Sequence, residues 1–434
     1  MKILLINPKN VGRGQATVRF MASTPLALSI LASLTPEEDS VVIIDENDRD
    51  IPYDMEVDIV GITSMLHVSG RALDIAKKFR SQGTTVVMGG FFVSLWPQKA
   101  EDHVDSIVIG EAENVWNTLL EDFRSGKLKK RYQTSTFSDL SNVPFISKKW
   151  FPNEECYHVE TSRGCPFHCD FCCVTRFYKG TLRHRPIPDV VRQIRECSDK
   201  MIFFVDDNIA INKKYAKELF KALTPLKISW SGQFSINAAN DDELLELCAE
   251  SGCKLLFTGF ETLNSKNLDD VDKNWMDTEK FPGLIENIHK HGIGVYGSFM
   301  FGFEKDTSDI FHQTLMFCEE NKLDLALFSA IFPVDGSKFH EQLKAENRIF
   351  EKDSSKFNGQ HSTFKTKNMT SRELDDGLRW IWKEFYSKRS MKKRVGHLLD
   401  KRKKSTLSTQ RNNLSAEEVM IAVNTAFRVA VADF

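Results

Sequence analysis

Three cysteines in one short loop are the residues of this sequence best placed to do chemistry. Residues 160–173 read ETSRGCPFHCDFCC, and the spacing C-x₃-C-x₂-C falls on Cys165, Cys169 and Cys172. Three thiolates on a tight loop can bind three irons of a cubane 4Fe–4S cluster and leave the fourth iron open. Gly164 permits the backbone to bend around the inorganic sulfide. The loop therefore predicts an iron–sulfur site with one exchangeable position.

A zinc site is the main alternative for this loop, with His168 or Cys173 as the fourth ligand. Zinc sites usually combine two paired half-sites that lie far apart in the sequence. The sequence has nine cysteines but no second C-x₂-C pair, so the spacing favours the cluster. Cys173 competes with Cys172 as the third ligand, and we expect it instead to be a core residue facing a helix.

The loop resembles the cluster-binding signature of the radical S-adenosylmethionine (SAM) superfamily, including an aromatic residue, Phe171, just before the third cysteine. The resemblance implies that the open iron binds the amino and carboxylate groups of SAM. It also implies reductive cleavage of SAM to methionine and a 5′-deoxyadenosyl radical, with a flavodoxin or ferredoxin as electron donor. The expected substrate is a small molecule or a peptide. The cofactor supplies the radical chemistry, and the protein positions it and excludes water.

The elements that must position this loop are a series of apolar runs separated by helical stretches. The expected strands are residues 158–162, 201–208, 228–237, 254–261, 294–303 and 325–332. Six strand–helix repeats predict a partial (β/α)₆ barrel over residues 151–345, rather than a full eightfold barrel. Residues 346–434 are expected to be mainly helical, and the basic run 388–404 is expected to be a solvated helix face.

Two acidic residues, Asp206 and Asp207, end the second of these strands and are expected at the barrel mouth. They resemble SAM-binding residues of the superfamily, which implies contacts with the methionine amino group or the ribose. The alternative for one of them is the N-cap of the helix expected at 213–223. The sequence does not distinguish which of the two faces the ligand.

Three polar residues on the next strand, Gln233, Ser235 and Asn237, alternate at period two. They are therefore expected to share one face, either toward a ligand or toward solvent at an edge. Glu261 follows in a Gly-Phe-Glu segment that resembles a strand end of the superfamily, which implies that its carboxylate accepts hydrogen bonds from the ribose.

The first 126 residues form a second alternating series, joined to the barrel by a polar linker at 127–150. The expected strands are residues 2–7, 41–45, 58–63, 85–90 and 106–111. Each run is continuously apolar, as in parallel strands buried on both faces. The series predicts a doubly wound, Rossmann-like α/β domain, whose ligands bind at the carboxyl ends of the strands.

This domain resembles the cobalamin-binding domain that precedes the barrel in a large radical SAM subgroup. The S-x-L element of that domain is matched by Ser64 and Leu66, and the G-G element by Gly89 and Gly90. The sequence departs from the D-x-H-x-x-G element of that domain, because Asn47 occupies the position at which the element has histidine. Histidine is a good nitrogen ligand for cobalt and an amide is a poor one. The domain is thus expected to bind cobalamin without that ligand, or to serve as a scaffold.

The resemblance implies cobalamin-dependent methylation of an unactivated carbon. The rival enzyme function is a cobalamin-independent radical SAM oxidoreductase, cyclase or rearrangement enzyme that keeps the N-terminal domain as a scaffold. A third class is a non-catalytic iron–sulfur or zinc scaffold protein. Loss of cluster absorbance and SAM cleavage in cysteine variants separates this class from the enzymes.

The composition of the chain limits the partners and the cellular compartment that we expect for the protein. The net charge of −2 gives no attraction to nucleic acid or to an anionic membrane surface. No apolar run reaches the ~18 residues of a membrane span, and the apolar N-terminal run ends at Pro8, too early for a signal peptide. The odd number of cysteines argues against a disulfide framework. We therefore expect a cytoplasmic protein with reduced thiols.

Overall fold

The computed structural model describes residues 1–9, 25–145, 149–150, 156–197, 201–402, 423–425 and 427–428. These residues fall into two compact units. The first unit comprises the described residues up to 150 together with Lys352–Asn358. The second comprises the described residues from 156 to 351 and from Gly359 onward. Each unit contains a parallel sheet of its own.

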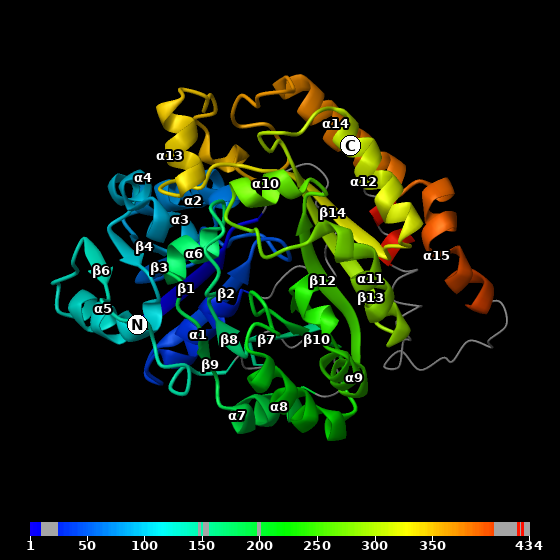
Figure 1. Cartoon of the computed structure of the whole chain (residues 1–434). Coiled ribbons are helices and arrows are strands. Elements are labelled where there is room, and N and C mark those ends of the chain that lie inside the picture. The colour runs from blue at the N-terminus through cyan, green and yellow to red at the C-terminus, as the bar shows by residue number, and fades with distance from the viewer. Residues whose placement is uncertain are drawn as a thin grey trace. The chain divides into compact units, whose positions relative to one another are not determined.

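The first unit is built on six parallel strands in the order β2-β1-β3-β4-β5-β6 (Figure 1). The strands are β1 (Lys2–Asn7), β2 (Ser40–Asp45), β3 (Ile59–Thr63), β4 (Thr85–Gly89), β5 (Ser106–Ile109) and β6 (Arg131–Gln133). The order reverses between β1 and β3, which is the switch point of a doubly wound sheet and confirms the predicted fold. Strand β6 lies inside the stretch predicted to be a linker, so the sheet is one strand wider than expected.

Helices cover both faces of a sheet of this kind, and their apolar sides complete its core. They are α1 (Leu26–Leu34), α2 (Ser69–Ser81), α3 (Phe91–Leu95), α4 (Pro97–Ala100), α5 (Trp116–Arg124) and the short 3₁₀ helices η2 (Leu66–Val68), η3 (Glu101–His103), η4 (Ala112–Asn114) and η8 (Ser354–Lys356). On one face, Leu5, Val87 and Val108 pack against Trp116 and Leu119 of α5. All five side chains are almost fully buried, as expected on a sheet face that is covered by helices.

The second unit contains six parallel strands in the order β14-β13-β12-β11-β10-β7. The strands are β7 (Cys156–Val159), β10 (Met201–Phe204), β11 (Ser229–Phe234), β12 (Cys253–Glu261), β13 (Gly294–Phe301) and β14 (Leu325–Ala330). Every strand lies beside the one that precedes it in this series, as in a barrel. The predicted partial (β/α)₆ barrel is confirmed.

Helices connect the barrel strands and extend beyond the last of them. They are α6 (Cys173–Tyr178), α7 (Ile187–Arg195), α8 (Lys213–Leu223), α9 (Asp242–Glu250), α10 (Ser265–Asp270), α11 (Phe281–Lys290), α12 (Asp309–Glu320), α13 (Lys338–Ala345), α14 (Ser371–Phe385), α15 (Lys388–Arg402) and the 3₁₀ helices η5 (Thr224–Leu226), η6 (Ile236–Asn240) and η7 (Thr278–Lys280). A small antiparallel pair, β8 (Ser162–Arg163) and β9 (Arg183–His184), closes the base of the cysteine loop. The pair was not predicted, because two residues are too few to show a period.

The sequence predicted that the basic helix α15 is a solvated helix face, but part of the helix is buried. Arg394 is fully buried and donates hydrogen bonds to the carbonyl oxygens of Leu323 (2.7 Å), Asp324 (3.0 Å) and Phe385 (2.7 Å). Its guanidinium also lies 3.4 Å from the centre of the Phe385 ring. Because the guanidinium satisfies carbonyl groups at the start of β14, it attaches α15 to the barrel.

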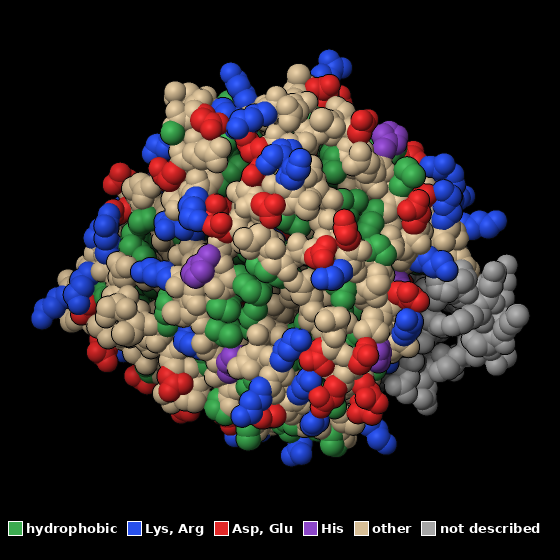
Figure 2. All heavy atoms as spheres, in the orientation of Figure 1, with side chains coloured by type: hydrophobic (Ala, Val, Ile, Leu, Met, Phe, Trp, Pro, Cys, Tyr) green, Lys and Arg blue, Asp and Glu red, His purple; other side chains and the backbone are tan. Residues whose placement is uncertain are grey.

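Charged side chains of both signs are mixed on the surface. On the face shown in Figure 2, Lys and Arg side chains lie among Asp and Glu side chains, which matches the small net charge. Within the described parts of the chain, no helix combines the length and the apolar character needed to cross a membrane.

Candidate functional site

The three loop cysteines line one cavity of about 220 Å³ in the barrel unit. Five other residues predicted for the site share this lining, and they are Phe171, Asp207, Gln233, Ser235 and Glu261. The structure therefore brings together the carboxyl ends of β10, β11 and β12 with the cysteine loop. Parallel barrels place their active sites at this end of the strands.

The chemistry of the donor set fits a cluster with an open iron. Burial raises the pKa of Cys165 to about 11 and that of Cys169 to about 12, so a metal must displace the thiol protons to bind. Neither proposed fourth zinc ligand belongs to the cavity lining. Cys173 is the first residue of α6, and the His168 ring lies against Gly180. Three cysteine thiols, with neither His168 nor Cys173 among the described residues of the lining, match the cubane site better than a tetrahedral zinc site.

The start of the cysteine loop requires glycine. Gly164 has φ +91°, and a Cβ atom there would lie 2.1 Å from the carbonyl oxygen of Thr181. Its N–H donates a 3.1 Å hydrogen bond to Oδ2 of Asp207. The loop thus leaves β8 and returns to β9 through a passage that has no room for a side chain.

The two acidic residues at the end of β10 have different surroundings. Asp206 is fully buried outside the cavity lining and accepts hydrogen bonds from the Thr161 backbone N–H (3.0 Å) and hydroxyl (2.6 Å). Asp207 lines the cavity. Burial raises the pKa of each carboxyl to about 6. Neither is a helix N-cap, because Asn212 caps α8 by accepting from the N–H of Tyr215. The predicted alternative of an aspartate cap is therefore wrong.

The period-two pattern predicted for three polar residues after the start of β11 holds for two of them. Gln233 and Ser235 line the cavity, but the strand ends at Phe234 and the chain then enters η6. Asn237 lies in that 3₁₀ helix outside the lining, and its side-chain amide donates a 2.7 Å hydrogen bond to the carbonyl oxygen of Trp275. The prediction that all three residues share one face is wrong at Asn237.

Lys273 and Trp275 line the cavity but were not identified from the sequence. The Lys273 ammonium forms an ion pair with Glu261, which adopts a left-handed backbone conformation (φ +64°). The Trp275 ring stacks on Phe167 of the cysteine loop, with ring centres 4.2 Å apart. Both residues come from an irregular segment after α10, where no motif marks them. The expected acceptor for ribose is thus an acid already paired with a buried lysine.

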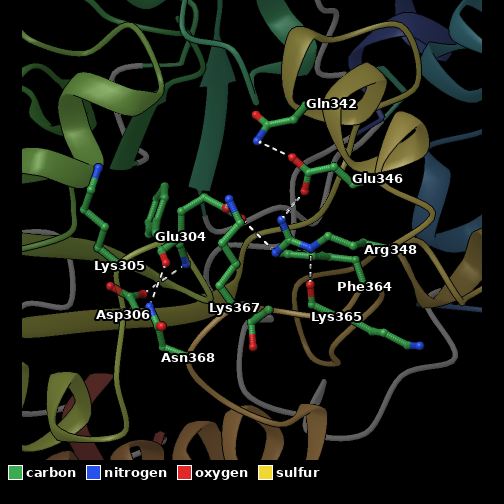
Figure 3. A network of polar contacts seen from close by, with 12 residues as sticks. Glu304, Lys305, Asp306, Gln342, Glu346, Arg348, Phe364, Lys365, Lys367 and Asn368 are labelled. Carbon is green, nitrogen blue, oxygen red and sulfur yellow. Dashed lines mark hydrogen bonds and ion pairs between the residues drawn. The ribbon is translucent and has the colours of Figure 1, made fainter.

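Phe171 is supported from behind by an apolar cluster. Its ring packs edge-on against Phe303, which follows β13, at 6.4 Å. The cluster also contains Phe339 of α13 and Phe364. The adjacent residue, Glu304, forms an ion-pair network that holds this segment in place, drawn in Figure 3.

Glu304 is the centre of the network, with its side chain only 14% exposed. It pairs with Arg348 (2.8 Å) and with Lys367, and its carbonyl oxygen accepts from Asn368 (2.9 Å). Arg348 extends the network to Glu346 at 2.7 Å. These contacts join the end of β13 to the segments after α13, so the support behind Phe171 depends on residues far from the cysteines in sequence.

A buried carboxyl at this same turn gives a pH-dependent prediction. Asp306 is 1% exposed and accepts hydrogen bonds from the N–H groups of Gly302 (2.9 Å) and Phe303 (3.1 Å). Burial raises its pKa to about 6, above that of an unfolded chain. The protonated form therefore favours folding below pH 4, and this contribution is lost as pH rises through 6.

We expect the unfolding free energy of the wild type, relative to Asp306→Asn, to fall by about 2 kcal/mol between pH 4 and 7, at about 1.4 kcal/mol per pKa unit. Urea unfolding at several pH values measures this difference. Asp309→Asn, at an exposed position in α12, is the matched control. Equal pH dependence for both variants would contradict the prediction.

The predicted cobalamin elements meet at the carboxyl edge of the sheet in the first unit. Ser64 follows β3, and its N–H donates to the carbonyl oxygen of Gly89 (3.0 Å). Gly90 has φ +96°, and a Cβ atom there would lie 2.7 Å from the Ser64 carbonyl oxygen and 2.8 Å from its nitrogen. Leu66 begins η2 directly after this contact. The S-x-L and G-G elements thus form one tight junction beside the switch point.

Asn47 lies two residues beyond the end of β2, whereas this junction follows β3 and β4. Its side-chain amide donates a 2.7 Å hydrogen bond to Asp45, and the residue is exposed. The adjacent Glu46 is buried, accepts from the backbone N–H of Lys9 (2.9 Å) and pairs with Arg71 of α2. Strand β2 is the outer neighbour of β1, so Asn47 is one strand removed from the β1–β3 switch point.

Comparison with known proteins agrees with both units. Residues 159–318 match the family model described as the radical SAM superfamily, and residues 49–147 match the model for the N-terminal region of radical SAM proteins. The chain is 31% identical over 363 residues to a bacteriochlorophyllide d C-8(2)-methyltransferase of Chlorobaculum tepidum, covering 79% of this chain and 80% of that protein.

Two further matches extend over more of the chain. A bacteriochlorophyllide d C-12(1)-methyltransferase of the same organism is 29% identical over 409 residues, covering 91% of this chain and 89% of that protein. The structure of the cobalamin-dependent SAM radical enzyme OxsB with aqua-cobalamin bound matches with a TM-score of 0.68 and 14% identity, covering 99% of this chain and 72% of that chain. The second match shows a shared fold. Together with the cysteine cavity, these similarities establish that the chain belongs to the radical SAM superfamily, in the subgroup with a cobalamin-binding-type domain before the barrel.

Proposed function

We propose that this protein is a cobalamin-dependent radical SAM methyltransferase that adds a methyl group to an unactivated carbon of a small molecule. The observation that carries the proposal is the cavity in which Cys165, Cys169 and Cys172 share a lining with polar strand ends and in which the described lining contains no fourth cysteine and no histidine. Such a site leaves one iron free for SAM. When bound, the cluster supplies the electron that cleaves SAM, and cobalamin supplies the methyl group.

The residues of this chain hold and shield that chemistry. The three thiolates bind the irons, while Gln233 and Ser235 offer hydrogen-bonding groups along the cavity wall. Phe171 and Trp275 contribute apolar surface that excludes water from a reactive radical. At the switch point of the first unit, the junction of Ser64 and Gly90 lies where doubly wound sheets bind ligands. This junction supports cobalamin binding at that edge.

Methylation is the reaction supported by the relatives. Both bacteriochlorophyllide enzymes are methyltransferases by name, and they align over 79% and 91% of this chain, which spans both units. The cobalamin bound in the similar OxsB structure supports the same cofactor here. We further infer a flavodoxin or ferredoxin as electron donor and a location in the cytoplasm, which keeps free thiols reduced.

The test is anaerobic reconstitution with iron, sulfide and hydroxocobalamin, followed by addition of a low-potential chemical reductant such as titanium(III) citrate and of SAM that carries a deuterated methyl group. Bacteriochlorophyllide d is the first probe substrate, because two relatives are named for it. Equal amounts of S-adenosylhomocysteine and 5′-deoxyadenosine, with the label in the product, are expected. A cobalamin-independent oxidoreductase, cyclase or rearrangement enzyme yields 5′-deoxyadenosine alone. Failure to retain cobalamin together with absence of S-adenosylhomocysteine would overturn the proposal.

A further inference from the structure

Lys273 is a buried cation that faces the cysteine cavity and that no motif accounts for. The residue is only 7% exposed and shares the cavity lining with Cys165, Cys169 and Cys172. A Cβ atom on Gly259 of β12 would lie 2.5 Å from Oε1 of Glu261, so glycine leaves room for the carboxylate that pairs with Lys273. A lysine side chain is rarely buried without a reason, because desolvating its charge is costly.

The side chain stays charged in this position. Glu261 supplies a carboxylate counter-charge within the same partly buried site, and the ion pair with it stabilises the ammonium form of Lys273. Glu261, which forms the ion pair with it, lines the same cavity.

The backbone holds Lys273 at a fixed place relative to the cysteine loop. The N–H of Asp170 donates a 3.2 Å hydrogen bond to the carbonyl oxygen of Val271. Lys338 of α13 bridges Asp170, at 3.3 Å, and Asp272. The segment that carries Lys273 is thus attached directly to the loop between the second and third cysteines.

We propose that the buried ammonium of Lys273 stabilises the one-electron-reduced form of the cluster held by the three cysteines. Reduction adds one electron from an external donor and no proton, so the cluster gains one negative charge. A nearby cation in a low-dielectric site stabilises that charge and raises the midpoint potential. The Glu261 carboxylate acts in the opposite direction and limits the effect. The proposal rests on the cluster assignment in the proposed function.

The test is a dithionite titration of the reconstituted cluster without SAM, followed by electron paramagnetic resonance. Lys273→Met is expected to lower the midpoint potential by at least about 59 mV, a tenfold change in the one-electron equilibrium. Glu261→Gln is expected to raise it, and the double variant to return close to the wild type. Lys273→Arg keeps the charge and is expected to restore most of the potential.

Lys305→Met is the matched control, because Lys305 is 42% exposed and pairs with Asp270 away from the cavity lining. A Lys273→Met potential equal to that of this control would overturn the proposal. If Lys273→Met does not hold a cluster, an unchanged potential in Glu261→Gln overturns it instead. The iron and sulfide content of the wild type tests the cluster assignment separately, so the two failures are distinguishable.

Discussion

Replacing Cys172 by alanine is expected to abolish the cluster and SAM cleavage, whereas replacing the adjacent Cys173 is expected to leave both intact. Cys172 lines the cavity with the other two cysteines. Cys173 is the first residue of α6 and does not belong to that lining. The two variants remove the same atom from neighbouring positions, so a general effect on folding does not explain a difference between them.

The measurement is iron and sulfide content, visible absorbance and 5′-deoxyadenosine formation after anaerobic reconstitution. In Cys172→Ala, 5′-deoxyadenosine formation is expected to fall to the background rate, and the absorbance of the intact 4Fe–4S cluster is expected to be lost. Cys173→Ala is expected to stay close to the wild type, with about 1 kcal/mol lost in stability from the smaller side chain. The reverse pattern would assign the third ligand to Cys173. Zinc in place of iron would favour the alternative site.

The architecture of both units was predictable from the sequence because parallel strands that are buried on both faces read as unbroken apolar runs. Strands β1, β3 and β4 are such runs, and their burial is nearly complete. Strand β6 was missed because Arg131 and Gln133 are exposed on either side of the buried Tyr132. A three-residue strand at a sheet edge has too little apolar sequence to stand out from a polar linker.

The site was predictable where local spacing determines it and not where contacts over long sequence distances do. The three cysteines follow from spacing alone. The sequence did not show whether Asp206 or Asp207 faces the cavity, because consecutive residues past a strand end lose the period of the strand. Lys273 was missed because its partner Glu261 is twelve residues away, across helix α10. Asn237 was misplaced because the pattern of β11 was extended beyond the point where the strand ends.

The adjacent glycines at the end of β4 give the sharpest test of the first unit. Gly90 has φ +96°, and a Cβ atom there meets the Ser64 backbone at 2.7 and 2.8 Å. A Cβ atom on Gly89 lies at an ordinary 3.7 Å from Val108. We expect Gly90→Ala to lose about 2–4 kcal/mol of stability from strain and overlap, and Gly89→Ala under about 1 kcal/mol.

The same pair of variants tests whether this junction binds cobalamin. Because alanine at position 90 must displace the Ser64 backbone beside the switch point, Gly90→Ala is expected to weaken hydroxocobalamin binding at least about tenfold, which corresponds to about 1.4 kcal/mol. Absorbance titration of the folded protein measures the affinity, and urea unfolding measures the stability. Gly89→Ala is expected to bind as the wild type does. If Gly90→Ala loses stability as expected but binds cobalamin with unchanged affinity, the junction of Ser64 and Gly90 is a structural turn and cobalamin binds elsewhere.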